Sequence, residues 1–245
     1  MRPVNLLLIL SLLVFSPAVF SQTVDNLYLL DANGKGTEDI KKAKFLLHEK
    51  KISDTCWQWD TYNYIGPLVK TERFKDKEAS VAHGWFHFYK PSGRIDSIIS
   101  FKNGLAHGDW YFYNDTSRAY LKKVYKDGIL VRTVDLIKED KPLDTVNRKE
   151  SEFPGGKAGW QRFLNKNLKY PERALQGHIQ GEVQLFFTVL DDGKVDDVEI
   201  FRSVEYSLDE EALRIIRKSP NWVPATKDGK KIISFKRQPV VYRFE

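Results

Sequence analysis

The middle of the chain contains a sequence repeat of fixed spacing. Ala82-His83-Gly84-Trp85 recurs as Ala106-His107-Gly108-Asp109-Trp110, and Phe101-Lys102-Asn103-Gly104 recurs as Tyr125-Lys126-Asp127-Gly128, both at a spacing of 24. A degenerate earlier copy runs from Trp57 to Asp76 at an offset of 27, which implies a three-residue insertion within residues 77–81. The repeat predicts that this part of the chain folds as a series of similar short units that pack on their neighbours.

Each repeat contains two short aromatic-rich stretches separated by turn residues. Asn103-Gly104 between alternating apolar positions indicates a hairpin, because both central residues of such a turn must accept a positive φ. Aromatic residues occupy both alternating sets at 85–89, so a strand here buries apolar groups on both faces or stacks them on neighbouring units. These features predict a single-layer antiparallel β-meander. The pattern of residues 57–137 resembles MORN-like repeats of the YwqK type.

The first residues have the pattern of an export signal. A positive residue precedes an apolar run over residues 6–15, and residues 19–21 suit a signal peptidase. We therefore expect residues 1–21 to be a signal peptide that is cleaved to leave the protein in the periplasm. The alternative is an uncleaved inner-membrane anchor, but a span takes about 20 apolar residues and Pro17 interrupts this run.

Composition limits the classes of fold and partner. With 42% hydrophobic residues the chain can bury a core, and its single cysteine, Cys56, cannot form an internal disulfide. Cys56 is interpreted as a buried apolar thiol. The formal net charge of +6 favours anionic partners, but basic and acidic residues are interspersed and the expected export argues against nucleic acid. We expect a partner in the cell envelope and no nucleic-acid binding.

Two segments outside the repeats are less regular. In residues 22–56, apolar residues within 38–49 predict a short helix. Residues 138–152 contain one proline, Pro142, with many charged and few apolar residues, which is typical of an exposed linker. The chain is therefore expected to comprise a repeat module at 57–137 and a C-terminal module at 153–245.

The C-terminal module begins with a helix and a hairpin. Residues 157–168 carry apolar residues at helical spacing, and this helix ends before Pro171 because the residue preceding proline is pushed out of the α region. Residues 182–189 alternate apolar and polar side chains, Asp192-Gly193 turns the chain, and residues 195–200 begin the return strand.

A second helix and a last strand complete this module. Ser207 is the expected N-cap, acidic residues at 209–211 occupy the first turn where the helix dipole favours them, and Pro220 stops the helix. Asp228-Gly229 makes a turn before a last strand at 232–244. The predicted class is α+β.

These residues resemble the TonB C-terminal domain. The matching motifs are Phe153-Pro154-Gly155-Gly156, Asn167-Leu168-Lys169-Tyr170-Pro171, Gly177-His178-Ile179-Gln180-Gly181, Asp192-Gly193, Leu208-Asp209-Glu210-Glu211-Ala212, Trp222-Val223-Pro224-Ala225, and Pro239 followed by Phe244. The resemblance covers the whole C-terminal module and implies a three-stranded antiparallel sheet with helices on one face.

The resemblance implies binding rather than catalysis. In that family the domain lies in the periplasm and binds the TonB box, a short extended segment of outer-membrane TonB-dependent transporters, by adding a strand to an open sheet edge. The implied partner-binding residues are Tyr170, Pro171, Lys231, Ile232, Ile233, Ser234, Phe235, Lys236, Arg237 and Gln238. Structural explanations stand beside this one, because Tyr170-Pro171 also ends a helix and basic residues also protect an edge from unwanted pairing.

The chain departs from that family where energy transduction is concerned. A transducer keeps an N-terminal helix in the inner membrane, where it contacts a proton-driven motor, and it crosses the periplasm with a long proline-rich segment. Here the expected signal is cleavable and the linker has one proline. The inner-membrane motor is therefore an expected partner only if the N-terminus stays uncleaved.

No motif indicates a metal, a cofactor or an enzyme. His83 and His107 occupy equivalent places in successive repeats, but no third ligand is repeated with them, so packing between repeats explains them better. The chain has no nucleophile elbow, phosphate loop or zincin motif. Two hypotheses follow. The first is a periplasmic TonB-like binding protein associated with outer-membrane transport, and the alternative is an envelope interaction or scaffold protein with no energy-transducing role.

Overall fold

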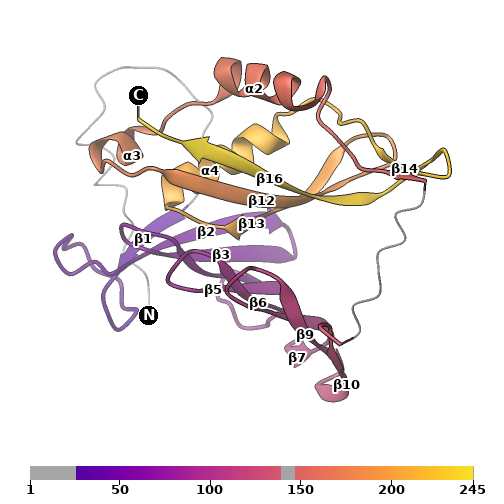
Figure 1. Ribbon diagram of the computed structural model, residues 1–245. Helices are drawn as coiled ribbons and strands as arrows, with labels where there is room; N and C mark the ends of the chain where they lie inside the picture. The colour runs from indigo at the N-terminus through magenta and orange to yellow at the C-terminus, as the bar shows by residue number, and fades with distance from the viewer. Residues whose placement is uncertain (1–25, 139–146, 245) are drawn as a thin grey trace. The chain divides into compact units, whose positions relative to one another are not determined.

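The computed structural model describes residues 26–138 and 147–244, and the expected signal peptide lies outside these residues. The chain divides into two compact units, which we call unit 1, up to residue 139, and unit 2, from residue 140. Figure 1 shows strands throughout unit 1 and both strands and helices in unit 2. The described parts are mostly antiparallel sheet with few helices. None of the helices in these two described ranges is both long and apolar enough to cross a membrane.

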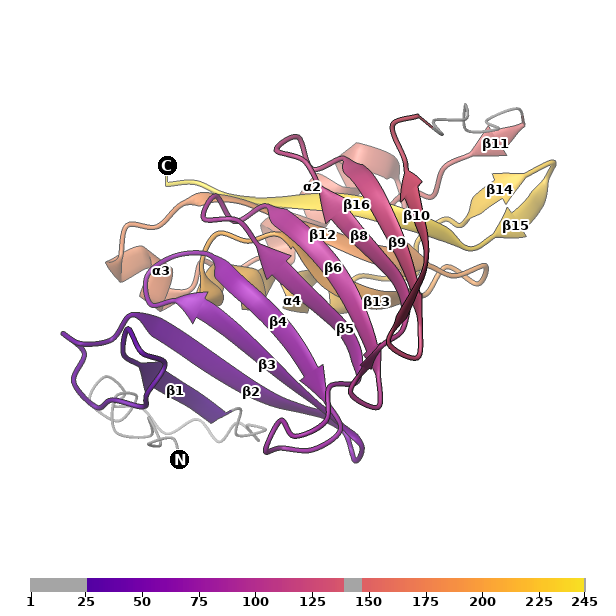
Figure 2. The same ribbon diagram turned by 90° about the horizontal axis from the view of Figure 1, so that it is seen from below.

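Unit 1 is one antiparallel sheet whose strands follow one another in chain order, as Figure 2 shows. Its strands are β1 (Asn26–Leu30), β2 (Phe45–Ser53), β3 (Cys56–Asn63), β4 (Leu68–Phe74), β5 (Gly84–Tyr89), β6 (Ile95–Lys102), β7 (Leu105–Ala106), β8 (Gly108–Tyr113), β9 (Ala119–Lys126) and β10 (Ile129–Asp135). The short β7 pairs only with β6, and β8 continues the order beside β6. The meander expected for residues 57–137 is present, and β1 and β2 extend it toward the N-terminus.

The prediction of a short helix within residues 38–49 is wrong. Residues 45–53 form β2, which pairs with β1 on one side, Leu47 opposite Tyr28, and with β3 on the other, Leu47 opposite Thr61. Before it, the Asp31 carboxylate accepts hydrogen bonds from the backbone N–H groups of Asn33 and Lys35 and closes a turn. Two flanking strands supply a full set of backbone partners, and this tertiary pairing outweighs a weak helical pattern.

The repeat is visible as a set of hydrogen bonds that recurs at the spacing of the sequence repeat. The backbone N–H of Gly104 donates to the carbonyl of Ala82, and the N–H of Gly128 donates to that of Ala106, both at 2.8 Å. In the same two turns, His83 Nδ1 accepts from the N–H of Asn103, and His107 Nδ1 accepts from that of Asp127. Both turns have positive φ at their two central residues. Each histidine therefore holds the turn of the next hairpin.

One face of the unit 1 sheet carries a continuous row of aromatic rings, one from each of the neighbouring strands β3, β4, β5, β6, β8 and β9. The centroid distances are 5.5 Å for Trp59–Phe74, 5.4 Å for Phe74–Phe86, 4.9 Å for Phe86–Phe101, 5.8 Å for Phe101–Trp110 and 4.3 Å for Trp110–Tyr125. Aromatic pairs of this kind contribute about 0.5–1.5 kcal/mol each beyond area burial. The described part of unit 1 has no second layer, and the row therefore joins its strands by contacts along the sheet.

Unit 2 combines helices with two small sheets. Its elements are β11 (Arg148–Lys149), α2 (Gly156–Asn167), α3 (Glu172–Gln176), β12 (Gly181–Val189), β13 (Val195–Arg202), α4 (Tyr206–Arg217), β14 (Ala225–Lys227), β15 (Lys230–Ile232) and β16 (Ser234–Tyr242). The larger sheet has the order β13-β12-β16, and the smaller one has the order β11-β14-β15. Both are antiparallel.

The core of unit 2 follows the alternation expected for residues 182–189. Val183, Leu185, Phe187 and Val189 of β12 are fully buried. On this face α4 contacts β12 and β13, and the Tyr242 hydroxyl of β16 donates to the Leu208 carbonyl of α4 at 3.1 Å. We call this side of the sheet the helix face.

An aromatic cluster attaches α2 to the same sheet. Trp222 lies at its centre, with ring centroids 5.1 Å from Phe187 of β12 and 5.5 Å from Phe153, which precedes α2. Phe153 in turn lies 5.3 Å from Trp160 of α2. Burial of each of these large rings contributes about 1.5–3 kcal/mol to stability, so the cluster is a main contribution to the packing of α2 on the sheet.

Two boundaries in unit 2 differ from those expected. The end of the expected linker is part of the fold, because β11 pairs with β14 and the backbones of Glu152 and Val223 exchange two hydrogen bonds. The N-cap of α4 is Glu205 rather than Ser207, and its carboxylate accepts hydrogen bonds from both the N–H and the hydroxyl of Ser207. Arg173 of α3 also pairs with Glu205, so a contact distant in sequence fixes this cap.

Asp209 in the first turn of α4 gives unit 2 a specific pH dependence. Burial raises the pKa of its carboxyl well above the ordinary value, against the lowering effect of hydrogen bonds from Ser203 and from the N–H of Val204. Folded unit 2 therefore binds a proton that the unfolded chain, with an Asp pKa of about 3.9, has released. The contribution of this group to stability falls as pH rises above that value, by up to about 1.4 kcal/mol per pH unit, until the folded pKa is passed.

We predict that Asp209→Asn becomes progressively more stable than the wild type as the pH is raised from 4 to 7, because asparagine stays neutral. Urea unfolding followed by the helical circular-dichroism signal reports on unit 2, since all the described helices lie there. Asp191→Asn, at an exposed turn position, is the control and should show no such trend. A stability difference for Asp209→Asn that is constant or falls with pH would contradict this assignment.

Candidate functional site

The outer edge of β16 is an open edge of the larger sheet in unit 2. β16 pairs along its whole length with β12, from Ser234 opposite Val189 to Tyr242 opposite Gly181, without a register shift. Within residues 26–138 and 147–244, no strand pairs with its other edge. An open edge presents a row of backbone donors and acceptors to a further strand.

Pro239 shows which backbone groups of β16 face the open edge. Proline has no N–H, so within a strand it is accommodated where that position faces away from the neighbouring strand. The backbone groups of one residue in a strand point to the same edge and alternate along the chain. With the register unbroken, the backbone groups of Phe235 and Val241 face the open edge, whereas those of Ser234, Lys236 and Gln238 face β12.

The side chains of β16 divide between the two faces of the sheet. Ser234, Val240 and Tyr242 are buried on the helix face, and Lys236 and Gln238 are half-buried there. Phe235, 66% exposed, lies on the opposite face, where its ring stacks on Phe186 of β12 at 5.4 Å. The guanidinium of Arg237 lies on the same face, 3.9 Å from the centre of the Phe201 ring.

Three of the expected binding residues do not belong to this edge. Lys231 and Ile232 lie in β15, which forms a hairpin with β14 in the smaller sheet, and Ile233 lies between β15 and β16. The expected single strand at 232–244 is thus interrupted at Ile233, where the chain passes from one sheet to the other. Ser234, Phe235, Lys236, Arg237 and Gln238 do lie in β16.

Tyr170 and Pro171 lie near the C-terminal end of β16. The Tyr170 hydroxyl donates to the carbonyl of Ile179 at 2.5 Å, and its ring stacks on Phe244 at a centroid distance of 5.1 Å. Pro171 is the N-cap of α3. These contacts give Tyr170 and Pro171 a structural role in joining α3 to the end of the last strand.

A cavity of about 280 Å³ opens beside β16 on the helix face. Its walls are Glu152, Phe153, Gly156, Lys157, Trp160, Trp222, Lys236 and Gln238. Lys236 donates from Nζ to the Ser151 carbonyl at 2.7 Å, which ties β16 to the segment before α2. Nothing in the residue pattern of the segment before α2 indicated this cavity, because its walls come from three parts of unit 2 distant in sequence.

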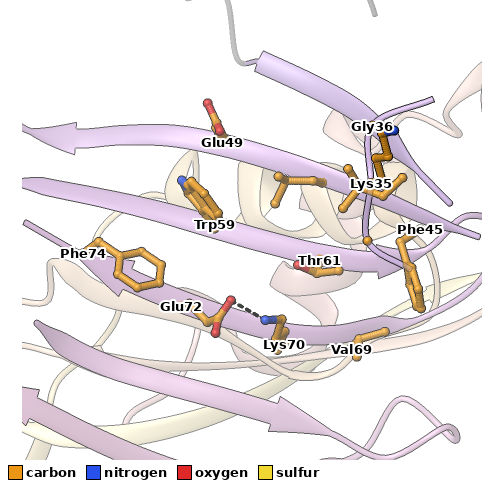
Figure 3. A pocket seen from close by; sticks show the side chains of 13 residues that line it. Lys35, Gly36, Phe45, Glu49, Trp59, Thr61, Val69, Lys70, Glu72 and Phe74 are labelled. Carbon is orange, nitrogen blue, oxygen red and sulfur yellow. Dashed lines mark ion pairs between the residues drawn. The ribbon is translucent and has the colours of Figure 1, made fainter. Parts of the chain in front are cut away.

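Unit 1 has a larger cavity at one end of its aromatic row. Figure 3 shows this cavity, about 700 Å³ in volume, on the sheet face of β2, β3 and β4. Phe45, Trp59 and Phe74 supply aromatic walls, and Lys70 and Glu72 form an ion pair of 2.6 Å on its floor. Burial raises the pKa of Glu49 at its side, and the Tyr28 hydroxyl lies 3.3 Å from that carboxylate.

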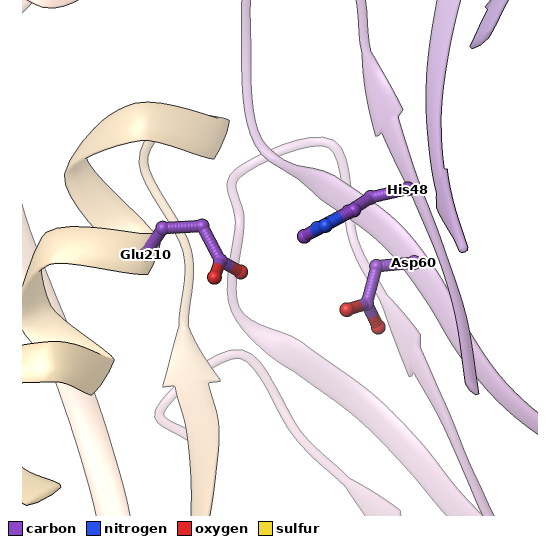
Figure 4. Close-up of side chains that lie close together, drawn as sticks. All are labelled: His48, Asp60 and Glu210. Atoms are coloured by element: carbon purple, nitrogen blue, oxygen red, sulfur yellow. The ribbon is translucent and has the colours of Figure 1, made fainter. Parts of the chain in front are cut away.

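His48 and Asp60 lie at paired positions of β2 and β3 on the other face of the unit 1 sheet (Figure 4). Burial acts to raise the pKa of Asp60, but Lys50 at 2.9 Å and a 2.7 Å hydrogen bond from Thr71 outweigh it, and the pKa is lowered. Asp60 is thus an ionised carboxylate satisfied by neighbours within unit 1. Glu210, also drawn in Figure 4, belongs to α4 of unit 2.

We predict that Tyr170→Phe lowers the free energy of unfolding of unit 2 by about 1–2 kcal/mol, because the Ile179 carbonyl loses its hydrogen-bond donor. Hydrogen exchange of the β12 amides would measure this loss within unit 2 alone. The control is Tyr120→Phe, at a half-exposed ring in unit 1, which should leave these amides unchanged. An unchanged exchange rate in Tyr170→Phe would show that the hydroxyl has no structural role.

Comparison with known proteins gives one sequence match and one solved structure. Residues 166–244 match the model of the family described as Gram-negative bacterial TonB protein C-terminal. The NMR solution structure of Helicobacter pylori TonB-CTD (residues 179-285) is 26% identical over 35% of this chain and 77% of that chain, with a TM-score of 0.28. A search of curated proteins found no match. The C-terminal part of unit 2 therefore has the sequence pattern of a TonB C-terminal domain, and the likeness of unit 1 to MORN-like repeats stays a prediction.

Proposed function

We propose that the protein is a periplasmic TonB-like binding protein associated with outer-membrane transport, which recognises an extended peptide of the TonB-box type. The peptide adds as a fourth strand to the open edge of β16. The observation that carries this proposal is the unpaired edge itself, which lies inside the segment that matches the TonB family. Main-chain hydrogen bonds from the outward-facing residues of β16 supply the affinity.

The chemistry of the edge agrees with a peptide ligand. Pro239 removes one N–H donor from the middle of the outer edge. A long strand from a second copy of this chain would span this position and lose one hydrogen bond there, whereas a short peptide can bind on one side of it. Neither nearby cation occupies the edge, because Lys236 Nζ donates to the Ser151 carbonyl and the Arg237 guanidinium lies over Phe201 of β13, on the far side of β12. We accordingly place binding at Phe235 to Gln238 and not at residues 231–233.

We predict that Phe235→Pro weakens binding of the peptide at least tenfold, because it removes an outward-facing N–H without breaking a bond to β12. The matched control is Phe235→Ala, which loses the exposed ring and keeps the N–H, and which should bind almost as the wild type does. Fluorescence anisotropy of the full chain with labelled TonB-box peptides from transporters of the same cell measures both. Equal affinities for the two variants would contradict strand addition here, and no binding at millimolar peptide would contradict the proposed function.

We further propose that the protein acts without an inner-membrane motor, because residues 1–21 have the pattern of a cleavable signal. N-terminal sequencing of the protein purified from the cell envelope should yield a chain that begins at Gln22. A chain that retains Met1 would instead support an anchored protein able to contact the motor.

The alternative function is an envelope scaffold that uses unit 1. The observation that favours it is the aromatic row of unit 1, which ends in the cavity of about 700 Å³ drawn in Figure 3. The two functions differ in which unit holds the partner. Retention of TonB-box peptides by the wild type and their loss in Phe235→Pro would favour the first.

A further inference from the structure

We propose that the cavity of about 280 Å³ beside β16 is a subsite for one large aromatic side chain of the incoming peptide. This inference rests on the proposed function, because it assumes a strand added to the outer edge of β16. It adds to that function a position-specific preference, which main-chain hydrogen bonds alone do not provide.

The position of the cavity follows from the geometry of the strand. Lys236 and Gln238 form part of its wall, and both side chains lie on the helix face of β16. A residue of an added strand directly opposite either of them points to the same face of the sheet. The wall beyond the edge consists of Phe153 and the first turns of α2, with Trp160. A side chain on the helix face of the added strand therefore enters between β16 and α2.

The size and the walls of the cavity select the chemistry of the side chain. A dry cavity of about 150 Å³ is enough to hold a benzene molecule, so about 280 Å³ accepts a whole aromatic side chain with room for its stem. Phe153, Trp160 and Trp222 already pack edge to face or at a tilt with centroids 5.3–6.1 Å apart, and a further ring continues this arrangement. Lys157 and Lys236 also line the cavity, and the face of an aromatic ring attracts such cations.

The alternation of the strand gives this proposal a distinctive signature. Only every second residue of an extended peptide faces α2, so an aromatic residue should raise affinity at alternate positions and not at those between them. A general attraction of apolar peptides to exposed surface would show no such period. The aromatic cluster of unit 2 thus has a second role, because the rings that attach α2 to the sheet also line the subsite.

The test uses the full chain and a series of labelled ten-residue peptides built from Thr and Ser, with a single Phe moved through the four central positions. Every second residue is N-methylated, so that only one edge of the peptide can pair and its register cannot shift by one residue. We expect affinities that alternate along the series, the tighter peptides binding at least tenfold more strongly than the weaker ones. Gln238→Phe fills the cavity from β16 and should remove the alternation. Lys157→Phe fills it from α2 and serves as the second variant if Gln238→Phe does not fold. Val241→Phe adds the same ring on the opposite face of β16 and should leave the alternation intact.

The outcomes separate this inference from the proposed function. If TonB-box peptides bind but the Phe series shows no alternation, or if neither filled variant changes it, the subsite is wrong and strand addition stands. If no peptide of either kind binds, both fail. If the filled variants instead abolish a concentration-dependent dimer measured by sedimentation, the cavity belongs to an interface between copies of this chain and the inference is overturned.

Discussion

The unbroken pairing of β16 with β12 determines most of what unit 2 presents to a partner. Nine consecutive residue pairs without a bulge fix both the face of each side chain and the edge of each backbone group. The nitrogen of Pro239 could face either β12 or the open edge. Only the second orientation is compatible with full pairing, because a proline nitrogen that faced β12 would cost a hydrogen bond between the two strands. A shift by one residue would also move Val240 and Tyr242 out of the core and Phe235 into it. Packing and backbone chemistry therefore agree on a single register.

Unit 1 meets a different constraint, because a single-layer sheet has no second layer in its described residues to bury its faces. Two repeated interactions compensate for this. Side chains contact their neighbours across strands, as in the row from Trp59 to Tyr125, and each hairpin turn is bonded to the preceding repeat through His83 or His107. Both interactions are local between neighbouring units, as in repeat proteins, whose stability is approximately a sum of terms within each repeat and between neighbouring repeats.

The parts of the structure that could be predicted from sequence are those with a local cause. The turn at Asn103-Gly104 and the alternation along β12 follow from residues adjacent in the chain, and both are present. Sequence patterns were wrong where structure depends on partners distant in the chain. The three cases are the strand at Phe45–Ser53, the cap at Glu205 and the break at Ile233. The same limit applied to the site, since residues 234–238 could be placed on the last strand while the cavity, with walls from α2 and Trp222, could not.

Affinity and selectivity have separate physical sources at such an edge. Backbone hydrogen bonds are the same for every peptide sequence, and each contributes only about 0.5–1.5 kcal/mol net, so an open edge alone binds extended segments weakly and without preference. Selection among the many extended segments of an envelope requires a side-chain contact whose energy depends on the residue, and burial of one aromatic ring supplies about as much as two such hydrogen bonds. The cavity formed by Phe153, Trp160 and Trp222 lies where this contact is needed, immediately beside the open edge and on the face that alternate residues of an added strand must occupy.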